Sequence, residues 1–483
     1  MTINAALSNA MSGPRAAGRS AEVISSNISN ALTPGYAKRT LSLSVNDHGG
    51  GGVRMVGISR ASDPALLSER HLAEAAQGQA RSITDFFATL ENLLGTPDDP
   101  ASLTAGLARF ESALITAASR PDASERLDLA VTEARRLATG IRDASVGIQK
   151  ARTQADGKIA IQVNEFNEAL QQVETLNRQI SVRSLQGGNT ASLTDQRQLA
   201  IDQISTLVPL RSMVRENGAI ALYATSGARL LDGSAAVIGF EPVNLVTPYM
   251  TQDGGSLSGL TINGKAIDTD PDHGALRGGS LSAQFAVRDH HGVAAQVQLD
   301  AFARDLISRF QDSALDPTLV PGDAGLFTDD GAHFDPVNEP GLAERLALNQ
   351  KVDPNQGGVV WRLRDGLNAT TPGEVGDASL LGDIGEALRA ARPPASGSFG
   401  GSPISTADLL TRISASFSSK RHSAEQELSF ESSRMVELQR RERAEGVDSD
   451  DELQRLMLIE QIYAANARVI ETVEEMMQTI LRL

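Results

Sequence analysis

The chain has 483 residues, of which 41% are hydrophobic, so it is long enough for two to four modules with their own cores. Aromatic residues make up only 4%, which favours long helices packed by aliphatic side chains over large ligand pockets. The net charge of -16 disfavours nucleic acid and anionic membrane as partners, because both would repel the chain. Cysteine is absent, which excludes disulfides, thiolate nucleophiles and cysteine-based metal sites.

Targeting signals are not evident. No run of about 18 apolar residues is present, so no segment is predicted to span a bilayer. The N-terminus lacks a basic stretch followed by an apolar core, so it does not resemble a Sec-type signal peptide. We therefore expect a protein that stays in the cytosol or leaves by a route without that signal.

A helix is predicted over residues 3–31, with apolar or small residues at alternating steps of four and three. This spacing is typical of a narrow coiled-coil seam, which needs a partner seam. The seam consists of Ile3, Leu7, Ala10, Pro14, Ala17, Ala21, Ile24, Ile28 and Ala31. Because proline removes a helical hydrogen bond, Gly13-Pro14 predicts a kink or a restart. Asn30 and Pro34-Gly35 are predicted to end the helix.

The next elements are two strands and a series of long helices. Alternating apolar residues predict strands at 38–45 and 53–58, separated by a flexible loop at Gly49 to Gly52. One predicted helix of about 60 residues would extend roughly 90 Å. The predicted helices are 64–95, 101–118, 123–186 and 195–207.

Residues 208–275 lack the helical periodicity of the preceding segments and are predicted to form four to six strands. Asn217-Gly218 and Asn263-Gly264 each lie between apolar runs, which is the signal of a type I′ hairpin. Helix is predicted to return at 280–312. An irregular segment follows at 313–380, then a linker rich in proline, glycine and serine near 392–403, and a long helix at 406–444.

A second seam lies at the C-terminus, after a capping box at Ser449 to Glu452. Its members are Leu456, Ile459, Tyr463, Asn466, Ile470, Val473, Met477 and Ile480. Since the two best seams lie at the two ends of the chain, we predict that they pair and take part in assembly. An ordinary helix pair within one subunit is the alternative, and the two are compatible. Asn466 either sets the register of the seam or faces solvent.

The predicted fold class is mainly α. We expect a nested architecture of paired terminal coiled-coil helices and a long-helix bundle, with a small β-rich subdomain inserted. The predicted domains are a terminal-helix domain, a long-helix domain and a small β-rich subdomain. Their residues are 1–60 with 446–483, 61–207 with 276–445, and 208–275. No spacing typical of a catalytic, cofactor or metal site is recognisable.

Several motifs, in this order along the chain, resemble bacterial flagellar axial proteins. Ser26-Asn27-Ile28-Ser29-Asn30 with Thr33-Pro34-Gly35-Tyr36 is similar to their N-terminal signature, and Tyr463 to Ile470 is similar to their terminal helix. The middle of the chain resembles the hook-associated protein 1 (FlgK) family of hook–filament junction proteins. The segments that carry this likeness are Asp195-Gln196-Arg197, Ile201 to Ile204, Gly274 to Leu281, and Gly446-Val447 before Asp450 to Leu453.

The resemblance implies a structural subunit of the extracellular flagellum that is secreted through the flagellar type III export apparatus with a chaperone. Implied partners are other copies of the chain in a ring, the hook protein and hook-associated protein 3, with no nucleic acid, membrane or cofactor. The large outer β domain of the family is expected to be reduced or absent. Together with the seams, the resemblance points to an assembly interface. Its residues are Ile3, Leu7, Ile24, Asn27, Ile28, Asn30, Pro34, Gly35, Tyr36, Leu456, Ile459, Tyr463, Asn466, Ile470, Val473, Met477 and Ile480.

Two alternatives stay open at this stage. A hook or rod protein of the same axial family would have similar ends but a body richer in strands. An enzyme or ligand-binding module in residues 208–380 would use the helices as a scaffold, although no nucleophile or metal pattern favours it.

Overall fold

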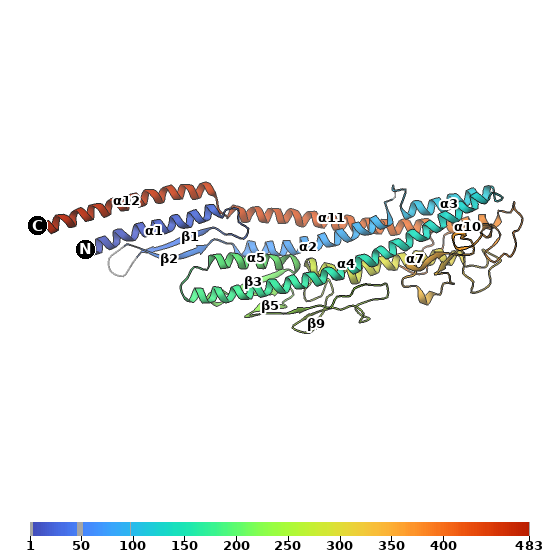
Figure 1. The fold of residues 1–483 in the computed structure, drawn as a ribbon, viewed down its shortest axis with the longest axis horizontal. Coiled ribbons are helices and arrows are strands. Elements are labelled where there is room, and N and C mark those ends of the chain that lie inside the picture. The colour runs from blue at the N-terminus through green and yellow to red at the C-terminus, as the bar shows by residue number, and fades with distance from the viewer. Residues whose placement is uncertain (1–2, 46–51, 97, 483) are drawn as a thin grey trace.

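The computed structural model describes residues 3–45, 52–96 and 98–482, and the side chains within them except those of 3–9 and 480–481. The molecule is elongated, with both termini at one end (Figure 1). There, α1 (Ile3–Ser29) lies beside α12 (Ser449–Arg482). An antiparallel hairpin of β1 (Arg39–Val45) and β2 (Val53–Arg60) packs on α1, so α1 lies between the hairpin and α12.

The rest of the molecule is a bundle of long helices, and the predicted bounds agree with it to within a few residues. Local capping explains several starts: the Asp63 carboxylate accepts hydrogen bonds from two backbone amides of the first turn of α2, and Ser405 caps α11. The bundle comprises α2 (Pro64–Leu94), α3 (Leu103–Ser119), α4 (Ser124–Leu185), α5 (Ala191–Leu207), α6 (Gly279–Phe285), α7 (Gly292–Phe310) and α11 (Thr406–Ala444). A π-helical turn, Ala286–His291, joins α6 to α7.

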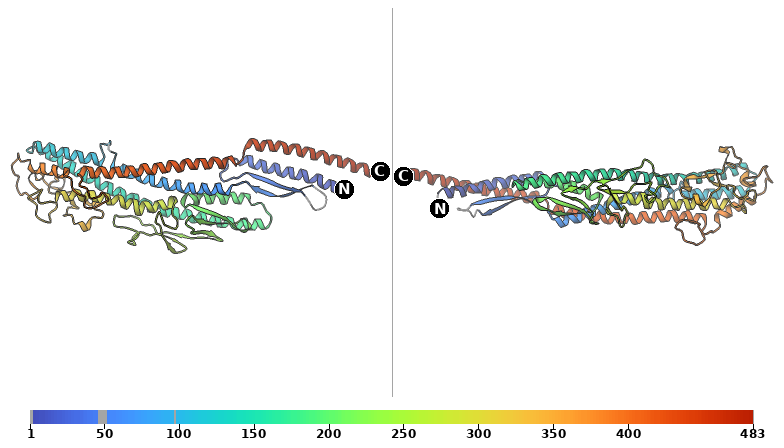
Figure 2. Two further views of the ribbon diagram at one scale, coloured as in Figure 1. Left: turned by 180° about the vertical axis from the view of Figure 1, so that it is seen from behind. Right: turned by 90° about the horizontal axis from the view of Figure 1, so that it is seen from below.

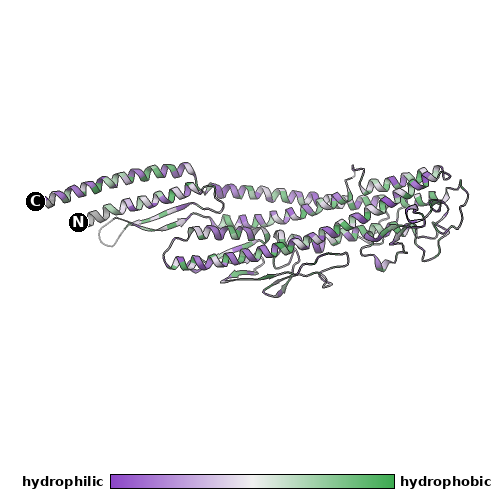
Figure 3. Ribbon diagram, in the orientation of Figure 1, coloured by the Kyte–Doolittle hydropathy of each residue, from purple (hydrophilic) through white to green (hydrophobic). Residues whose placement is uncertain are grey.

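Helix α4 connects two separate hydrophobic cores. Its N-terminal half packs with α3, α7 and α11 at the end of the molecule far from the termini. Its C-terminal half packs with α5, α6 and the β-rich segment. The apolar residues lie along one side of each helix, as the alternating stripes in Figure 3 show. The mainly α class is therefore confirmed.

The β-rich segment contains seven short strands in two sheets rather than the predicted four to six. One sheet has the order β3 (Leu210–Val214), β4 (Ile220–Ala224), β5 (Arg229–Asp232) and β6 (Ser234–Ala235). The other contains β7 (Ile238–Gly239), β8 (Leu260–Ile262) and β9 (Lys265–Ile267). Both predicted turns have Asn and Gly at positive φ, as type I′ turns require. Strands of two residues are too short for the sequence pattern to reveal.

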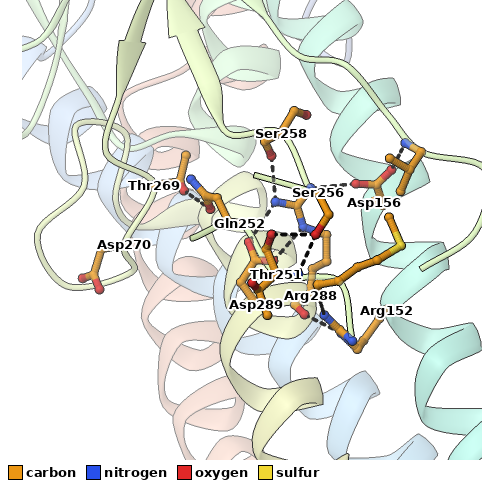
Figure 4. A network of polar contacts seen from close by, with 12 residues as sticks. Arg152, Asp156, Thr251, Gln252, Ser256, Ser258, Thr269, Asp270, Arg288 and Asp289 are labelled. Atoms are coloured by element: carbon orange, nitrogen blue, oxygen red, sulfur yellow. Dashed lines mark hydrogen bonds and ion pairs between the residues drawn. The ribbon is translucent and has the colours of Figure 1, made fainter. Parts of the chain in front are cut away.

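Buried arginines attach this segment to the long helices (Figure 4). Arg152 on α4 donates to the backbone carbonyls of Arg288, Thr247 and Met250, and Arg288 donates to the Ser258 carbonyl. Arg288 also forms an ion pair of 2.6 Å with Asp156, whose other oxygen accepts from the Val243 amide. Asp156 and Asp289 balance the charge of Arg288, whereas Arg152 is held by hydrogen bonds to carbonyl oxygens.

Residues 311–405 cover the far end of the bundle (Figure 2). Most of this stretch is irregular, as predicted, but α10 (Ser379–Arg389) was not predicted. Apolar residues of the stretch 311–405, among them Phe327, Phe334 and Ile384, pack in the same core as α3 and α7. The short elements here are β10 (Phe327–Asp329), α8 (Leu342–Arg345), β11 (Leu346–Leu348), α9 (Arg362–Asp365) and the 3-10 turns Pro336–Asn338 and Pro354–Gln356. A further 3-10 turn is Glu216–Gly218.

Two sequence predictions concern the N-terminal region. The restart at Gly13-Pro14 is wrong: α1 runs through Pro14 as one helix, because packing on α12 and on the hairpin outweighs the one lost hydrogen bond. The predicted loop at Gly49 to Gly52 lies outside the described residues except for Gly52. Among the helices that the structure describes, none is long and apolar enough to cross a membrane.

Candidate functional site

The two predicted seams face each other along the paired termini. Ile24 and Val473 are buried, and Ile28, Leu456, Ile459, Asn466, Ile470 and Met477 are half-buried. Tyr463 differs, since 52% of it is exposed. Ile3, Leu7 and Ile480 lie outside the described side chains. Most described seam residues are thus at least half-buried in the single chain, whereas Tyr463 is exposed.

Asn466 is half-buried and lies against α1 at Gly13. A Cβ added at Gly13 would lie 2.7 Å from the Asn466 Oδ1 atom, so the two helices approach closely where α1 has no side chain. The Asn466 amide donates to the Ile462 carbonyl of its own helix at 2.9 Å. A glycine opposite a polar residue at one level favours a single register of the pair.

Asn27 is the centre of the corner that follows α1. Its side chain is fully buried and makes four hydrogen bonds. Nδ2 donates to the Arg39 carbonyl (2.9 Å) and to Glu452 Oε2 (2.8 Å). Oδ1 accepts from the Arg39 amide (3.0 Å) and from the Tyr36 hydroxyl (2.9 Å). Asn27 therefore joins α1, the start of the hairpin and α12, three segments that are far apart in sequence.

Among the hydrogen-bond partners described for Asn27, Glu452 is the one that comes from the C-terminal segment. Its side chain is 1% exposed and forms ion pairs with Lys38 (3.3 Å) and Arg455 (3.2 Å). A buried carboxylate is stable only when its oxygens are satisfied, and here one amide and two cations satisfy them. We call Asn27, Tyr36, Lys38 and Glu452 the terminal lock.

The other predicted residues of the corner shape the turn. Asn30 Nδ2 donates to the Ser26 carbonyl, and Tyr36 lies under the Arg39 guanidinium, 4.6 Å from its ring centroid. Gly35 has φ of 74°, and a Cβ there would lie 2.7 Å from Leu199 on α5. Glycine is needed for both reasons. Pro34 is exposed, so it is available to a neighbouring molecule.

The hairpin connects the terminal pair to the bundle through Asp195 on α5. Its carboxylate accepts from Arg39 at 2.7 Å and from Arg60 at 2.8 Å. Beside this joint lies a cleft of about 590 Å³, bordered by the 31–38 turn, by 60–63 and by the last turn of α11. A contact made by two cations around one anion limits how the terminal pair can tilt against the bundle.

One group of side chains in the described part of the chain has the composition of a metal site. The ligand atoms of His71, Glu74 and Asp202 lie within 4.8 Å of one another. Arg70 occupies the centre, pairing with Glu74 at 2.5 Å and with Asp202 at 2.7 Å. Burial raises the pKa of Glu74; at Asp202, the hydrogen bond from His71 and the charge of Arg70 outweigh burial and lower the pKa. Because the Arg70 guanidinium pairs with both carboxylates, this group is a polar contact between α2 and α5.

The sequence did not reveal the acidic residues of these two contacts, Glu452 of the terminal lock and Asp195 beside Arg39 and Arg60. Glu452 was noted as a capping residue and Asp195 as part of a motif, but neither was assigned a contact. The available signal was the group of basic residues Lys38, Arg39 and Arg60, which need acidic partners when they are partly buried.

Comparison with known proteins finds similarity to flagellar proteins. The family model described as "Flagellar hook-associated protein FlgK helical domain" matches residues 87–315, which run from the last turns of α2 to just beyond α7. Over these residues the chain is similar to the FlgK family of flagellar hook-associated proteins. It is therefore a structural protein of the bacterial flagellum. A second model, "Flagellar basal body rod FlgEFG protein C-terminal", matches residues 438–483 and thus the end of α11 and all of α12.

Individual relatives agree with this assignment. The chain is 24% identical over 426 residues to flagellar hook-associated protein 1 of Escherichia coli K12, covering 79% of this chain and 76% of that protein. For the protein of the same name from Bacillus subtilis 168, identity is 22% over 381 residues, with 71% and 74% covered. For that from Salmonella typhimurium LT2, identity is 25% over 242 residues, and the chain spans only 43% of that protein.

One solved structure is also similar. It is titled "The structure of the flagellar hook junction protein FlgK from Burkholderia pseudomallei" and aligns at 21% identity with a TM-score of 0.44. The alignment covers 54% of this chain and 46% of the solved chain. A likeness at this level supports no conclusion about the present chain.

Proposed function

We propose that this FlgK-family chain forms the junction between the flagellar hook and filament, and that its paired termini build it into the flagellar axis. The observation that carries the proposal is the position of the two family matches. The helical-domain model falls on the bundle, and the rod-type model falls on α12, which pairs with α1. We assign residues 1–60 and 446–483 to an inner-tube unit, 61–207 and 276–445 to the long-helix unit, and 208–275 to a β-rich subdomain.

The terminal unit is suited to ordering during assembly. Among the described side chains of α12, only Glu452 and Val473 are buried in the single chain. A long helix with so little buried surface gains little to offset the chain entropy lost on folding. Neighbouring subunits would supply the missing contacts, so the termini would become ordered when the subunit is incorporated. The seam residues, Pro34 and Tyr36 would then lie at contacts between subunits.

In this function the chain acts by packing and without covalent chemistry or a cofactor. Many weak contacts around a ring add up to a stable joint. Its partners would be other copies of itself, the hook protein and hook-associated protein 3. The subunit would be held by a chaperone and pass through the flagellar type III export apparatus to the cell exterior. The charge of -16 keeps the free subunit soluble and away from nucleic acid and anionic membranes.

A rod or hook subunit is the second candidate, because the model that matches α12 is a rod-type one. The match of the FlgK helical domain over residues 87–315 favours the junction instead.

Deletion of the gene in its host distinguishes the two functions. A junction protein predicts a complete hook without a filament and flagellin shed into the medium, whereas a rod or hook protein predicts no hook. Re-expression of the full chain should restore the filament, and re-expression of a chain ending at residue 448 should not. Normal filaments in the deletion strain would refute both assignments.

A further inference from the structure

A chain of buried hydrogen bonds connects two distant parts of the bundle. It begins at Arg152 on α4, which donates to carbonyl groups of the 247–250 loop in the β-rich segment, and it ends at Asp300 on α7. Arg152 donates to Gln149 at 2.8 Å, and Gln149 donates to Gln296 at 2.8 Å. Gln296 in turn donates to the Asp300 carboxylate at 2.9 Å. These four side chains are at most 6% exposed. We call them the amide relay.

Asp300 connects the amide relay to the stretch 311–405, which covers the far end of the bundle. Its Oδ2 atom accepts from the Gly341 amide and its Oδ1 atom from the Ala343 amide, both at 2.8 Å. These two amides lie at the start of α8, where backbone N–H groups have no partner within the helix. The amide relay therefore joins the β-rich segment to the covering stretch through the core.

The amide relay has one direction, and both of its ends require it. A guanidinium can only donate, so Gln149 turns its carbonyl oxygen toward Arg152. A carboxylate can only accept, so Gln296 turns its amide nitrogen toward Asp300. The two charges thus favour the same arrangement of the glutamines, and hydrogen bonds in such a chain strengthen one another in a dry interior.

Protonation of Asp300 opposes this direction. A carboxylic acid has a proton that needs an acceptor, whereas Gly341, Ala343 and Gln296 all present donors. Gln296 supplies an acceptor only if its amide turns over. Its nitrogen then faces the donor nitrogen of Gln149, which breaks the chain toward Arg152.

The ionisable groups around Asp300 do not replace the amide relay. Arg345 of α8 lowers the pKa of Asp300 through space, but burial outweighs it and raises that pKa to about 6. On α4, the side chains that meet Gln296 are the neutral Ser145 and Gln149. The other ionisable groups nearby pair among themselves: Arg304 with Glu339, Arg345 with Asp329, and Tyr249 with Arg345.

We propose that Arg152 and Asp300 form an ion pair relayed by Gln149 and Gln296, and that protonation of Asp300 loosens the hold of Arg152 on the 247–250 loop. Because such a coupling is reciprocal, release of Arg152 also favours protonation of Asp300. The attachment of the β-rich segment therefore responds to pH at the far end of the bundle. The amide relay lies within one chain, so this inference does not rest on the proposed function.

A double-mutant cycle on the purified full chain tests the amide relay. Asp300→Asn and Arg152→Leu are made singly and together, and urea unfolding is measured at pH 7.5 and pH 4. At pH 7.5, Asp300→Asn should be about tenfold more destabilising, in the unfolding equilibrium constant, when Arg152 is present than in the Arg152→Leu background. At pH 4, where Asp300 is protonated, this difference should fall below about twofold.

Asp316→Asn is the matched control for this cycle. Asp316 is also a buried acid that accepts from two backbone amides, those of Thr318 and Leu367, but it lies outside the amide relay. Its effect should be the same, within about twofold, with and without Arg152→Leu at both pH values.

Gln149→Met separates the amide relay from a direct attraction between the two charges. Both charges remain in this variant, but the chain is interrupted, so the coupling at pH 7.5 should fall below about twofold. Coupling that is unchanged by Gln149→Met, or that is missing from the cycle at pH 7.5, overturns the inference.

Hydrogen exchange gives the answer if Arg152→Leu or Gln149→Met does not fold. The amides of Met250 and Thr251 are hydrogen-bonded within the loop. After correction for intrinsic exchange, their protection in the wild-type chain should fall about fivefold or more from pH 7.5 to pH 4.5, and Asp300→Asn should remove this change. Protection that is independent of pH in the wild-type chain overturns the inference.

Discussion

Replacing Asn27 by alanine should release the terminal pair from the hairpin. Asn27 makes three hydrogen bonds to neutral groups, worth about 1 kcal/mol each, and one to the buried Glu452 carboxylate, worth about 2 kcal/mol. Their sum is an upper limit, because water can enter the space left by the side chain. We therefore expect a loss of about 3–5 kcal/mol in the stability of the terminal unit, with the bundle unaffected.

Hydrogen exchange of the purified chain measures this loss locally. Protection of amides near residues 21–29 and 449–456 should fall at least 100-fold in Asn27→Ala, while amides in the middle of α4 keep their rates. Asn30→Ala is the matched control, because Asn30 makes only local bonds at the exposed end of the same helix, and it should cost at most about 1 kcal/mol. Equal exchange in the two variants would show that the terminal lock does not stabilise the pair.

Three further predictions concern packing and buried charge. Gly13→Ala should destabilise the α1–α12 pair by about 1–3 kcal/mol. Adding Asn466→Ala should restore the stability, because the atoms that clash with the new methyl group all belong to the Asn466 amide. Failure of this rescue in hydrogen exchange would contradict the contact. Burial raises the pKa of Asp300 to about 6, so the stability it contributes is present at pH 4 and is lost as the pH rises through about 6. The stability of Asp300→Asn relative to wild type should therefore improve by up to roughly 3 kcal/mol between pH 4 and pH 7.5, read from urea unfolding midpoints, and a constant difference would refute this. Arg152→Leu should lower the stability of the bundle by about 3–5 kcal/mol. Arg152→Lys should recover only part of this loss, since lysine cannot reach the carbonyls of Thr247, Met250 and Arg288 together. Full recovery by lysine in thermal unfolding would argue against the network.

The local elements of this protein can be predicted from its sequence because their causes are local. Helix spans follow from apolar periodicity and from capping residues such as Asp63 and Ser405, which act within one turn. The hairpin turns at Asn217 and Asn263 follow from the backbone preference of two adjacent residues. The heptad spacing likewise selects the side of α12 that carries its half-buried residues, with Tyr463 as the exception.

Contacts that span the chain could not be predicted in the same way. Nothing near Asn27 indicates that its amide meets Glu452, which is 425 residues away, or that Asp195 holds both Arg39 and Arg60. Pro14 was expected to kink or restart a helix that tertiary packing keeps continuous. By itself, the sequence determined the length, type and apolar side of the long helices, because periodicity is a property of neighbouring residues. Only the tertiary structure decided which buried charges pair and how the terminal unit joins the bundle, because those choices depend on segments brought together by folding.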